Sequence, residues 1–397
     1  MAQQSYGLDQ VMESMMEISN ILDSETRTSY KTITIGRGRR QQLINSTGRF
    51  CVAFRMEGIR SQLCYRIWKE LIPDAMQRYK MIGNRISKTQ LEYFSGFRYV
   101  PSALKMKCDG SILPGIVMEW IEGKKLDAFM TEEWSTLSDI QRLTFIRDFY
   151  YMCHQLRENG ISHGDLSCMN ILVTPERHIR LVDYDSLFVP EMGRNFYQTT
   201  GGAPAFQHPD RTNASYPMLS SLEDDNFSQL VIALSLWVAY FDPSITQNYD
   251  DSNLLFLPAD MSGETGSERL RNLKNSNGWK RAEKVSTKFG HIPILMKGLE
   301  SIQNSVNQVP SLLKFASKEV ILSADFYRLL DSAGHNVSST QLVPYCTACG
   351  QKFGNDEFKF CTACGTKRHT YTVSSTFIPY RHEPVSYTHL TLPTKRI

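Results

Sequence analysis

The chain has 397 residues, of which 41% are hydrophobic and 21% charged, and its formal net charge is +3. A chain of this length is too long for one small core and is expected to form two or three folded units. Its composition is that of an ordinary globular protein. Such a small positive excess argues neither for nor against a nucleic-acid partner. The longest apolar run, residues 230–241, is well short of the roughly 20 residues that span a bilayer. Because the N-terminus also lacks the order of a secretory signal, we expect a cytoplasmic protein without a membrane partner.

The nine cysteines are unevenly spaced, which bears on the redox compartment. Five are scattered through the first 170 residues, in segments expected to form the core, and four are clustered near the C-terminus. A free buried cysteine behaves as a small hydrophobe. Nothing in the spacing resembles a disulfide framework, so a reducing compartment is predicted.

Residues 1–30 are predicted to form an N-terminal helical extension. Leu8, Val11, Met15 and Leu22 recur at the spacing of an amphipathic helix. The simplest interpretation is a helix docked on the main body of the protein. The alternative is a helix that binds a partner.

Residues 31–126 favour strands. Lys31–Ile35 alternates in polarity, Arg49–Met56 follows a Thr-Gly turn, and Ile112–Ile121 is a further apolar strand. One helical stretch, Pro73–Ser87, interrupts them. This part is therefore expected to be a small sheet with one helix.

Residues 127–335 favour helices. Ser138–Asn159 has apolar residues at helical spacing, and Phe227–Tyr240 is apolar on nearly all sides, as a central buried helix would be. A further helix is predicted over Pro310–Leu330, and two brief strands lie near residues 170–182. The fold class is α+β, with a small β-rich part before a larger helical part.

Three polar residues, Asp165, Asn170 and Asp183, are spaced in a way that suits phosphoryl transfer from ATP. That reaction needs metal ions on the β- and γ-phosphates and a carboxylate that orients the incoming nucleophile. Hard cations such as Mg²⁺ take oxygen ligands, which Asp and Asn supply. Asp165 and Asn170 fit the pattern His-Arg-Asp-x-x-x-x-Asn of kinase catalytic loops, with Gly164 in place of Arg. We predict that Asn170 and Asp183 hold Mg²⁺ or Mn²⁺ and that Asp165 faces the acceptor, whereas His163 is a packing residue.

Further motifs, in order along residues 31–330, resemble those of the protein-kinase superfamily. Val52-Ala53-Phe54-Arg55 resembles the strand that carries Val-Ala-Ile-Lys, and residues 117–121 resemble the hinge between the lobes. Residues 202–210 resemble the end of an activation segment, and residues 225–227 open the predicted central helix. The HGD and DYD triplets more narrowly resemble a group of bacterial kinase-like proteins of poorly defined substrate. The resemblance implies a two-lobed protein-kinase-like fold that binds ATP, with nucleotide contacts from Gly36, Gly38, Arg55, Glu119 and Ile121.

Several residues depart from the kinase pattern and leave the activity open. Arg55 stands where a lysine is expected, and its planar fork is no simple substitute for an ammonium. Residues 74–86, the helix expected to supply a glutamate partner, contain no Glu, and Gly36 and Gly38 form a degenerate glycine-rich loop. Two interpretations follow. One is a metal-dependent phosphotransferase acting on an unknown protein or small molecule, and the other is a pseudokinase that serves as a nucleotide-binding or scaffold module.

Two short cysteine motifs predict a metal site near the C-terminus. Cys346 and Cys349, like Cys361 and Cys364, form Cys-x-x-Cys-Gly sequences that supply four thiolates, the set that structural zinc prefers. Residues 344–370 therefore resemble a four-cysteine zinc ribbon, to which the metal would contribute on the order of 10 kcal/mol. A redox role requires a thioredoxin-like setting that this region lacks. Zinc ribbons bind protein or nucleic acid, and the sequence does not favour either kind of partner.

Residues 385–397 are predicted not to belong to a folded domain. Val385–Thr394 match the translation of a common sequencing adapter over ten consecutive positions. Segments of this kind are excluded from fold reasoning. The natural C-terminus is then expected to differ from the one printed.

Overall fold

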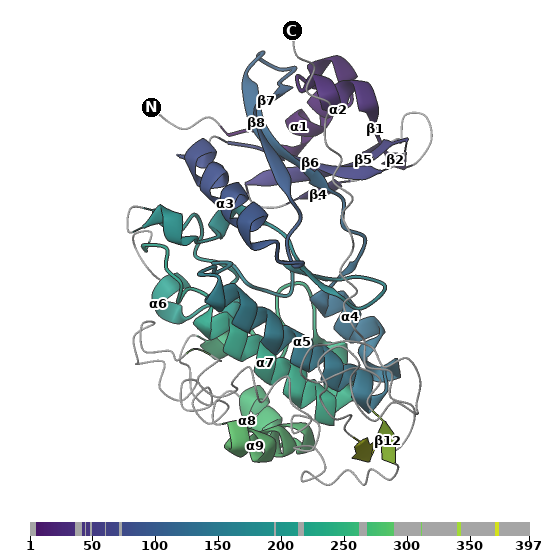
Figure 1. The fold of residues 1–397 in the computed structure, drawn as a ribbon, viewed down its shortest axis with the longest axis vertical. Helices are drawn as coiled ribbons and strands as arrows, with labels where there is room; N and C mark the ends of the chain where they lie inside the picture. Colours follow the sequence, from purple (N-terminus) through teal and green to yellow (C-terminus); the bar gives the residue numbers. More distant parts are fainter. Residues whose placement is uncertain are drawn as a thin grey trace, which may run out of the picture.

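The structure, a computed structural model, has a small antiparallel sheet above a larger helical part (Figure 1). It describes residues 5–35, 42–43, 45–47, 50–59, 61–70, 74–193, 196–212, 218–261, 268–289, 311, 340–342 and 370–372. The mixed α+β architecture, strands first and helices after, agrees with the expectation from sequence. The four clustered cysteines, the two glycines of the predicted glycine-rich loop, most of the predicted helix over 310–330 and the C-terminal segment lie outside the described residues.

The upper part is built on a six-stranded antiparallel sheet with the order β1-β5-β6-β8-β7, to which β4 adds beside β5. Its strands are β1 (Tyr30–Thr32), β4 (Asn45–Thr47), β5 (Cys51–Gly58), β6 (Gln62–Trp68), β7 (Phe97–Lys105) and β8 (Ile112–Glu119). A separate small hairpin pairs β2 (Thr34–Ile35) with β3 (Gln42–Leu43). The sequence analysis had assigned no element to β6 or β7. Both carry polar residues that obscure the alternation, Arg66 in β6 and Arg98 in β7.

The two faces of this sheet belong to two separate cores. Val52, Phe54 and Tyr65 point to one face and pack with the N-terminal extension. Trp68 and Ile116 point to the other face and join the large core of the helical part. Because side chains alternate along a strand, β6 contacts the extension with one set of residues and the helical part with the other.

The N-terminal extension covers the sheet face that points away from the helical part. It contains α1 (Leu8–Met15), a 3₁₀ turn η1 (Ile18–Asn20) and α2 (Ser24–Ser29). Val11, Met15 and Ile21 are fully buried there, and the backbone N–H of Leu22 donates to the carbonyl of Ala103 at 2.9 Å. Of the two arrangements considered from sequence, the structure has the docked one.

The helical part is centred on α7 (Asn226–Phe241), whose residues are all buried. The helix α3 (Ala75–Thr89) packs against β7 of the sheet. The other helices of the helical part are α4 (Leu126–Glu132), α5 (Asp139–Glu158), α6 (Pro209–Thr212), α8 (Glu268–Asn275) and α9 (Asn277–Phe289). The short 3₁₀ turns are η3 (Trp134–Thr136), η4 (Tyr184–Ser186), η5 (Pro190–Met192), η6 (Pro204–Phe206), η7 (Pro243–Asn248) and η8 (Pro258–Met261). Within the described segments, no helix is both long and apolar enough to cross a membrane.

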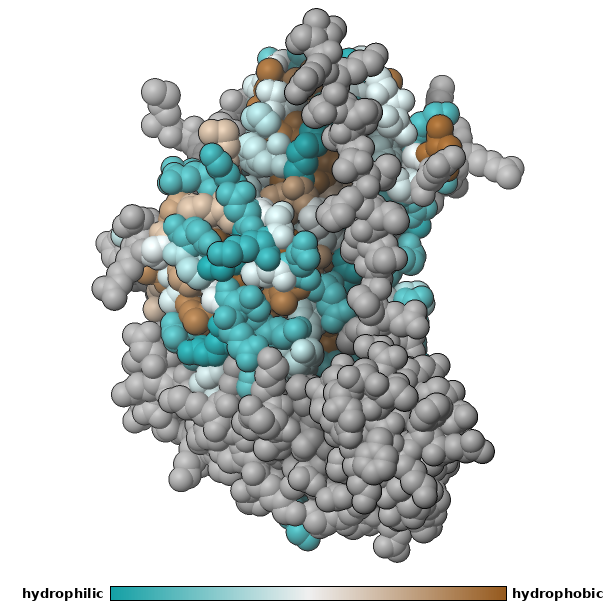
Figure 2. Space-filling model, viewed as in Figure 1, coloured by the Kyte–Doolittle hydropathy of each residue, from teal (hydrophilic) through white to brown (hydrophobic). Residues whose placement is uncertain are grey.

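A second small sheet lies where the two parts meet. Its strands are β9 (Lys124–Lys125), β10 (Ile171–Val173) and β11 (Ile179–Leu181), in the order β11-β10-β9. Far along the chain, β12 (Thr340–Leu342) pairs with β13 (Thr370–Thr372) and so brackets the segment that contains the four clustered cysteines. On the face shown in Figure 2, hydrophobic residues of the described part form small separate areas among hydrophilic ones.

Candidate functional site

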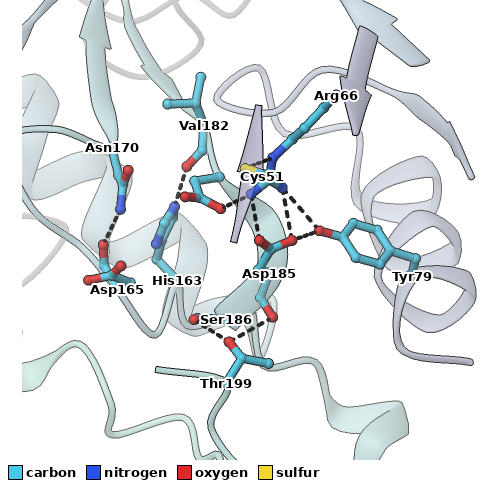
Figure 3. Close-up of polar contacts among 11 residues, drawn as sticks. Cys51, Arg66, Tyr79, His163, Asp165, Asn170, Val182, Asp185, Ser186 and Thr199 are labelled. Atoms are coloured by element: carbon cyan, nitrogen blue, oxygen red, sulfur yellow. Dashed lines mark hydrogen bonds and ion pairs between the residues drawn. The ribbon is translucent and has the colours of Figure 1, made fainter. Parts of the chain in front are cut away.

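The catalytic-loop residues predicted from sequence come together with the Asp183 triplet. The loop runs from α5 to β10, and the triplet follows β11 directly. The Asn170 Nδ2 atom donates to the Asp165 carbonyl at 2.7 Å (Figure 3). The Val182 N–H donates to the Asn170 carbonyl at 3.0 Å. These two bonds hold Asn170 between Asp165 and the strand end that carries Asp183.

The Asp165 carboxylate is partly buried and suited to accept a proton. Its Oδ1 atom accepts from the Ala203 N–H at 3.1 Å, which links the loop to the segment before η6. Burial raises the pKa of the Asp165 carboxyl to about 7, and the negative charge of Asp183 adds to the rise. A group with a pKa near neutrality is efficient as a general base.

A buried carboxylate fixes the backbone of this loop from below. Asp225, at the start of α7, accepts from the N–H groups of His163 at 2.5 Å and Gly164 at 2.8 Å. The His163 Nε2 atom bonds to the Val182 carbonyl at 2.8 Å, and this ring is fully buried. His163 therefore lies in the interior and is bonded to the residue just before Asp183.

Gly164 explains why the kinase arginine is absent from this loop. Its φ is +76°, a conformation that L side chains rarely adopt, and a Cβ there would collide with the Ser186 carbonyl oxygen. The buried Arg211 side chain donates to the Gly164 carbonyl. Arg211 also donates to Gln198 Oε1 and Gln207 Oε1, both at 2.7 Å. Arg211 was not among the site residues predicted from sequence. Its position two residues after Pro209 was the available signal.

Arg55 lies at the hinge and not beside Asp183. Its guanidinium donates to Gln62 Oε1 at 2.7 Å, pairs with Glu122 at 3.1 Å, and lies 5.3 Å from the centre of the Trp120 ring. The hinge residue Glu119 ends β8 and is exposed, and Ile121 is half-buried. These residues lie in or next to residues 117–121, the predicted hinge between the two parts.

The cation that faces the triplet is Arg66, which the sequence analysis did not identify. It comes from β6, the strand that directly precedes α3, whereas Arg55 comes from β5. Its Nη2 atom is 2.7 Å from Asp183 Oδ1. Ala53 and Arg66 are register partners, so Arg55 and Arg66 project from the same face of the sheet, one strand apart. The two arginines therefore differ by one strand in their position on the sheet, and Arg66 is the one that contacts Asp183.

The oxygen donors suit a hard cation. Asn170 uses its Nδ2 atom on Asp165, which directs Oδ1 elsewhere, and the Asp183 side chain is 37% exposed. In the part of the chain that the structure describes, no three or more His, Cys, Asp or Glu side chains gather to hold a metal ion. A cation here would therefore take further oxygen ligands from water and nucleotide phosphates, as Mg²⁺ commonly does.

Comparison with known proteins agrees with this geometry. A search of curated proteins finds no match to the chain. Residues 104–200, which run from the end of β7 through the hinge, the catalytic loop and the triplet, match the family model described as protein tyrosine and serine/threonine kinase. This part of the chain is therefore similar to protein kinase domains.

Proposed function

We propose that the protein binds ATP with Mg²⁺ or Mn²⁺ between its two parts and transfers the terminal phosphoryl group to an acceptor. The main support for this proposal is the pair of hydrogen bonds that joins Asp165, Asn170 and Val182. These bonds hold the oxygen donors of Asn170 and Asp183 near the Asp165 carboxylate, whose pKa is raised. A bound cation would neutralise charge on the transferred phosphate. The acceptor is a protein or a small molecule.

Each residue has a distinct part in this scheme. Asn170 and Asp183 hold the cation, and Asp165 accepts the proton of the acceptor hydroxyl. The backbone around Glu119 and Ile121 contacts the adenine. Arg66 takes the phosphate-facing position first assigned to Arg55, because it is the arginine that reaches Asp183.

The alternative function is a pseudokinase, and one observation favours it. The Arg66 guanidinium is already engaged by Asp183, the same carboxylate that the cation requires. If this ion pair persists with nucleotide present, the chain serves as a nucleotide-binding or scaffold module. The two functions differ in whether Asp183 exchanges the arginine for a metal.

The test measures ATP affinity and phosphoryl transfer in the same protein. Calorimetry with ATP is run with Mg²⁺ and then with EDTA, and labelled ATP reports autophosphorylation and hydrolysis. The proposal expects metal-dependent ATP binding and transfer of label. ATP binding that does not depend on metal, without transfer or hydrolysis, would support the pseudokinase as a nucleotide-binding module. No ATP binding would exclude the phosphotransferase and leave only the scaffold role.

We further propose that Cys346, Cys349, Cys361 and Cys364 hold one structural Zn²⁺ ion. The support is their spacing and the pairing of β12 with β13 around them, which would close a unit of ribbon size. Such a unit would bind a protein or nucleic acid partner. Elemental analysis of the purified protein is expected to give one zinc per chain, and a Cys349→Ser and Cys364→Ser double variant is expected to lose it.

A further inference from the structure

All five N–H donors of the buried Arg66 guanidinium have partners. Nη1 and Nη2 donate to the two carboxylate oxygens of Asp185 at 2.8 and 2.5 Å, and Nη2 also donates to Asp183 at 2.7 Å. Nη1 reaches the Tyr79 hydroxyl at 3.2 Å and Nε the Cys51 sulfur at 2.8 Å (Figure 3). The bidentate contact to Asp185 fixes the plane of the guanidinium, and an ammonium with three donors could not make this set of bonds.

The helix that faces Arg66 supplies a phenol and no carboxylate. In kinases, the lysine of the equivalent strand pairs with a glutamate of the neighbouring helix. Here α3 contains no Glu, and its Tyr79 hydroxyl donates to Asp185. The Tyr79 ring packs edge-on against Trp68 at 5.0 Å and Phe97 at 5.3 Å, so its hydroxyl is held in place. The carboxylate partner has moved from the helix to the third residue of the triplet.

We propose that Asp185 is the positioning residue for Arg66 and that it replaces the helix glutamate of kinases. This inference rests on the proposed function. With ATP and a cation bound, Asp183 would hold the cation, and the Arg66 Nη2 hydrogen that now donates to Asp183 would donate to a phosphate oxygen. Asp185 keeps its two bonds throughout, so the guanidinium stays in place while one donor changes partner.

The charges explain why Asp185 is needed for this exchange. The Arg66 and Asp185 side chains are only 6% and 8% exposed, and a buried charge without its partner is strongly unfavourable. Without Asp185, Asp183 would be the only carboxylate left to Arg66. It would then be held by the arginine and withheld from the cation.

The experiment separates phosphate recognition from folding by comparing two ligands. Affinities for ATP and for adenosine are measured in Mg²⁺ for the parent, Arg66→Ala, Asp185→Ala and the double variant. Each single variant is expected to weaken ATP binding about tenfold or more and adenosine binding less than about twofold. The double variant is expected to be no weaker than Arg66→Ala, because Asp185 acts through Arg66. Asp185→Asn, which keeps the volume, is measured alongside in case the alanine variant does not fold.

The matched control is Glu191→Gln. Glu191 pairs with Arg85 of α3 at 3.2 Å, so this variant also removes a carboxylate that contacts an arginine near the same helix. It is expected to leave both affinities unchanged.

If the parent binds ATP more tightly than adenosine, two outcomes would contradict this inference without contradicting the proposed function. In one, loss of the Asp185 carboxylate does not change the ratio of the two affinities. In the other, its effect persists in full when Arg66 is already absent, which would mean that Asp185 acts on the metal directly. A parent that binds ATP no more tightly than adenosine overturns the proposed function and the inference together.

Discussion

The two halves of the candidate site are built in different ways. In the helical half, the bonds from Asn170 to Asp165 and from His163 to Val182 join residues 5 and 19 positions apart. In the sheet half, one guanidinium reaches carboxylates that lie 117 and 119 residues away. The helical half is therefore held by contacts within the helical part, whereas the sheet half depends on contact between the two parts of the molecule.

This difference predicts which steps depend on each half. The helical half contains the groups that act on the acceptor and the metal. The sheet half contains the cation that would contact the phosphates. Changes in the first should alter turnover or metal dependence, and changes in the second should alter phosphate affinity.

The largest expected effect is on turnover, from Asp165→Asn. The amide cannot accept the acceptor proton, and loss of a general base typically lowers kcat by about 10²–10⁴. The Kd for ATP should stay within about twofold, because Asp165 does not face the nucleotide in this scheme. Single-turnover transfer of labelled phosphate, with calorimetry for ATP, checks both values. A parallel loss of ATP affinity would show that Asp165 helps to bind the metal.

The next effect is on metal dependence, from Asp183→Asn. This change removes the charge that faces the cation, so we expect ATP affinity in Mg²⁺ to fall about tenfold or more. In EDTA the variant should equal the parent or exceed it, because Arg66 loses a competing carboxylate. Calorimetry under both conditions tests this, with Asp148→Asn as a control for loss of a carboxylate that pairs with a neighbouring arginine. Equal losses with and without metal would assign Asp183 a structural role.

A smaller effect is expected from Arg55→Ala. Arg55 projects from the same sheet face as Arg66 but contacts Gln62, Glu122 and the Trp120 ring. Its loss should change the ratio of ATP to adenosine affinity by less than about twofold, because none of these contacts reaches Asp183 or Asp185. The same two titrations used for Arg66 measure it. A loss as large as that of Arg66→Ala would return the phosphate-facing position to Arg55.

The helical half could be predicted from sequence because its contacts are local. Asp165 and Asn170 lie on one loop, so their spacing in sequence nearly fixes their spacing in space. The sheet half could not be predicted in this way. The Val-Ala-Phe-Arg sequence of β5 matches the lysine-strand motif better than the Leu-Cys-Tyr-Arg sequence of β6. Only the structure shows that β6, which pairs with β5 and directly precedes α3, is the strand that contacts the triplet. Nothing in the sequence pairs Asp185 with Tyr79, which lies 106 residues earlier.

The last prediction concerns stability and not the site, at the far face of the sheet, where Asp23 anchors the N-terminal extension. Asp23 accepts from the Thr26 N–H at 3.1 Å, capping α2, and pairs with Arg98 of β7 at 2.8 Å. The hydrogen bond from Arg98 lowers the pKa of Asp23 to about 2. Asp23→Asn is expected to lower the free energy of unfolding by about 1–2 kcal/mol at pH 7, allowing for the partial exposure of Arg98.

The lowered pKa of Asp23 determines how its contribution to the free energy of unfolding changes with pH. A carboxyl whose pKa is lower in the folded state stabilises the fold above its unfolded pKa and loses that contribution as the pH falls. The difference between the parent and Asp23→Asn should therefore be constant above about pH 5 and shrink below about pH 4. Urea unfolding across this range measures it, with Glu25→Gln as the control, because Glu25 pairs with the same arginine but is 73% exposed. ATP affinity should be unchanged, since the extension packs on the face of the sheet opposite Arg66, and a fall in affinity would show that the extension is coupled to the site.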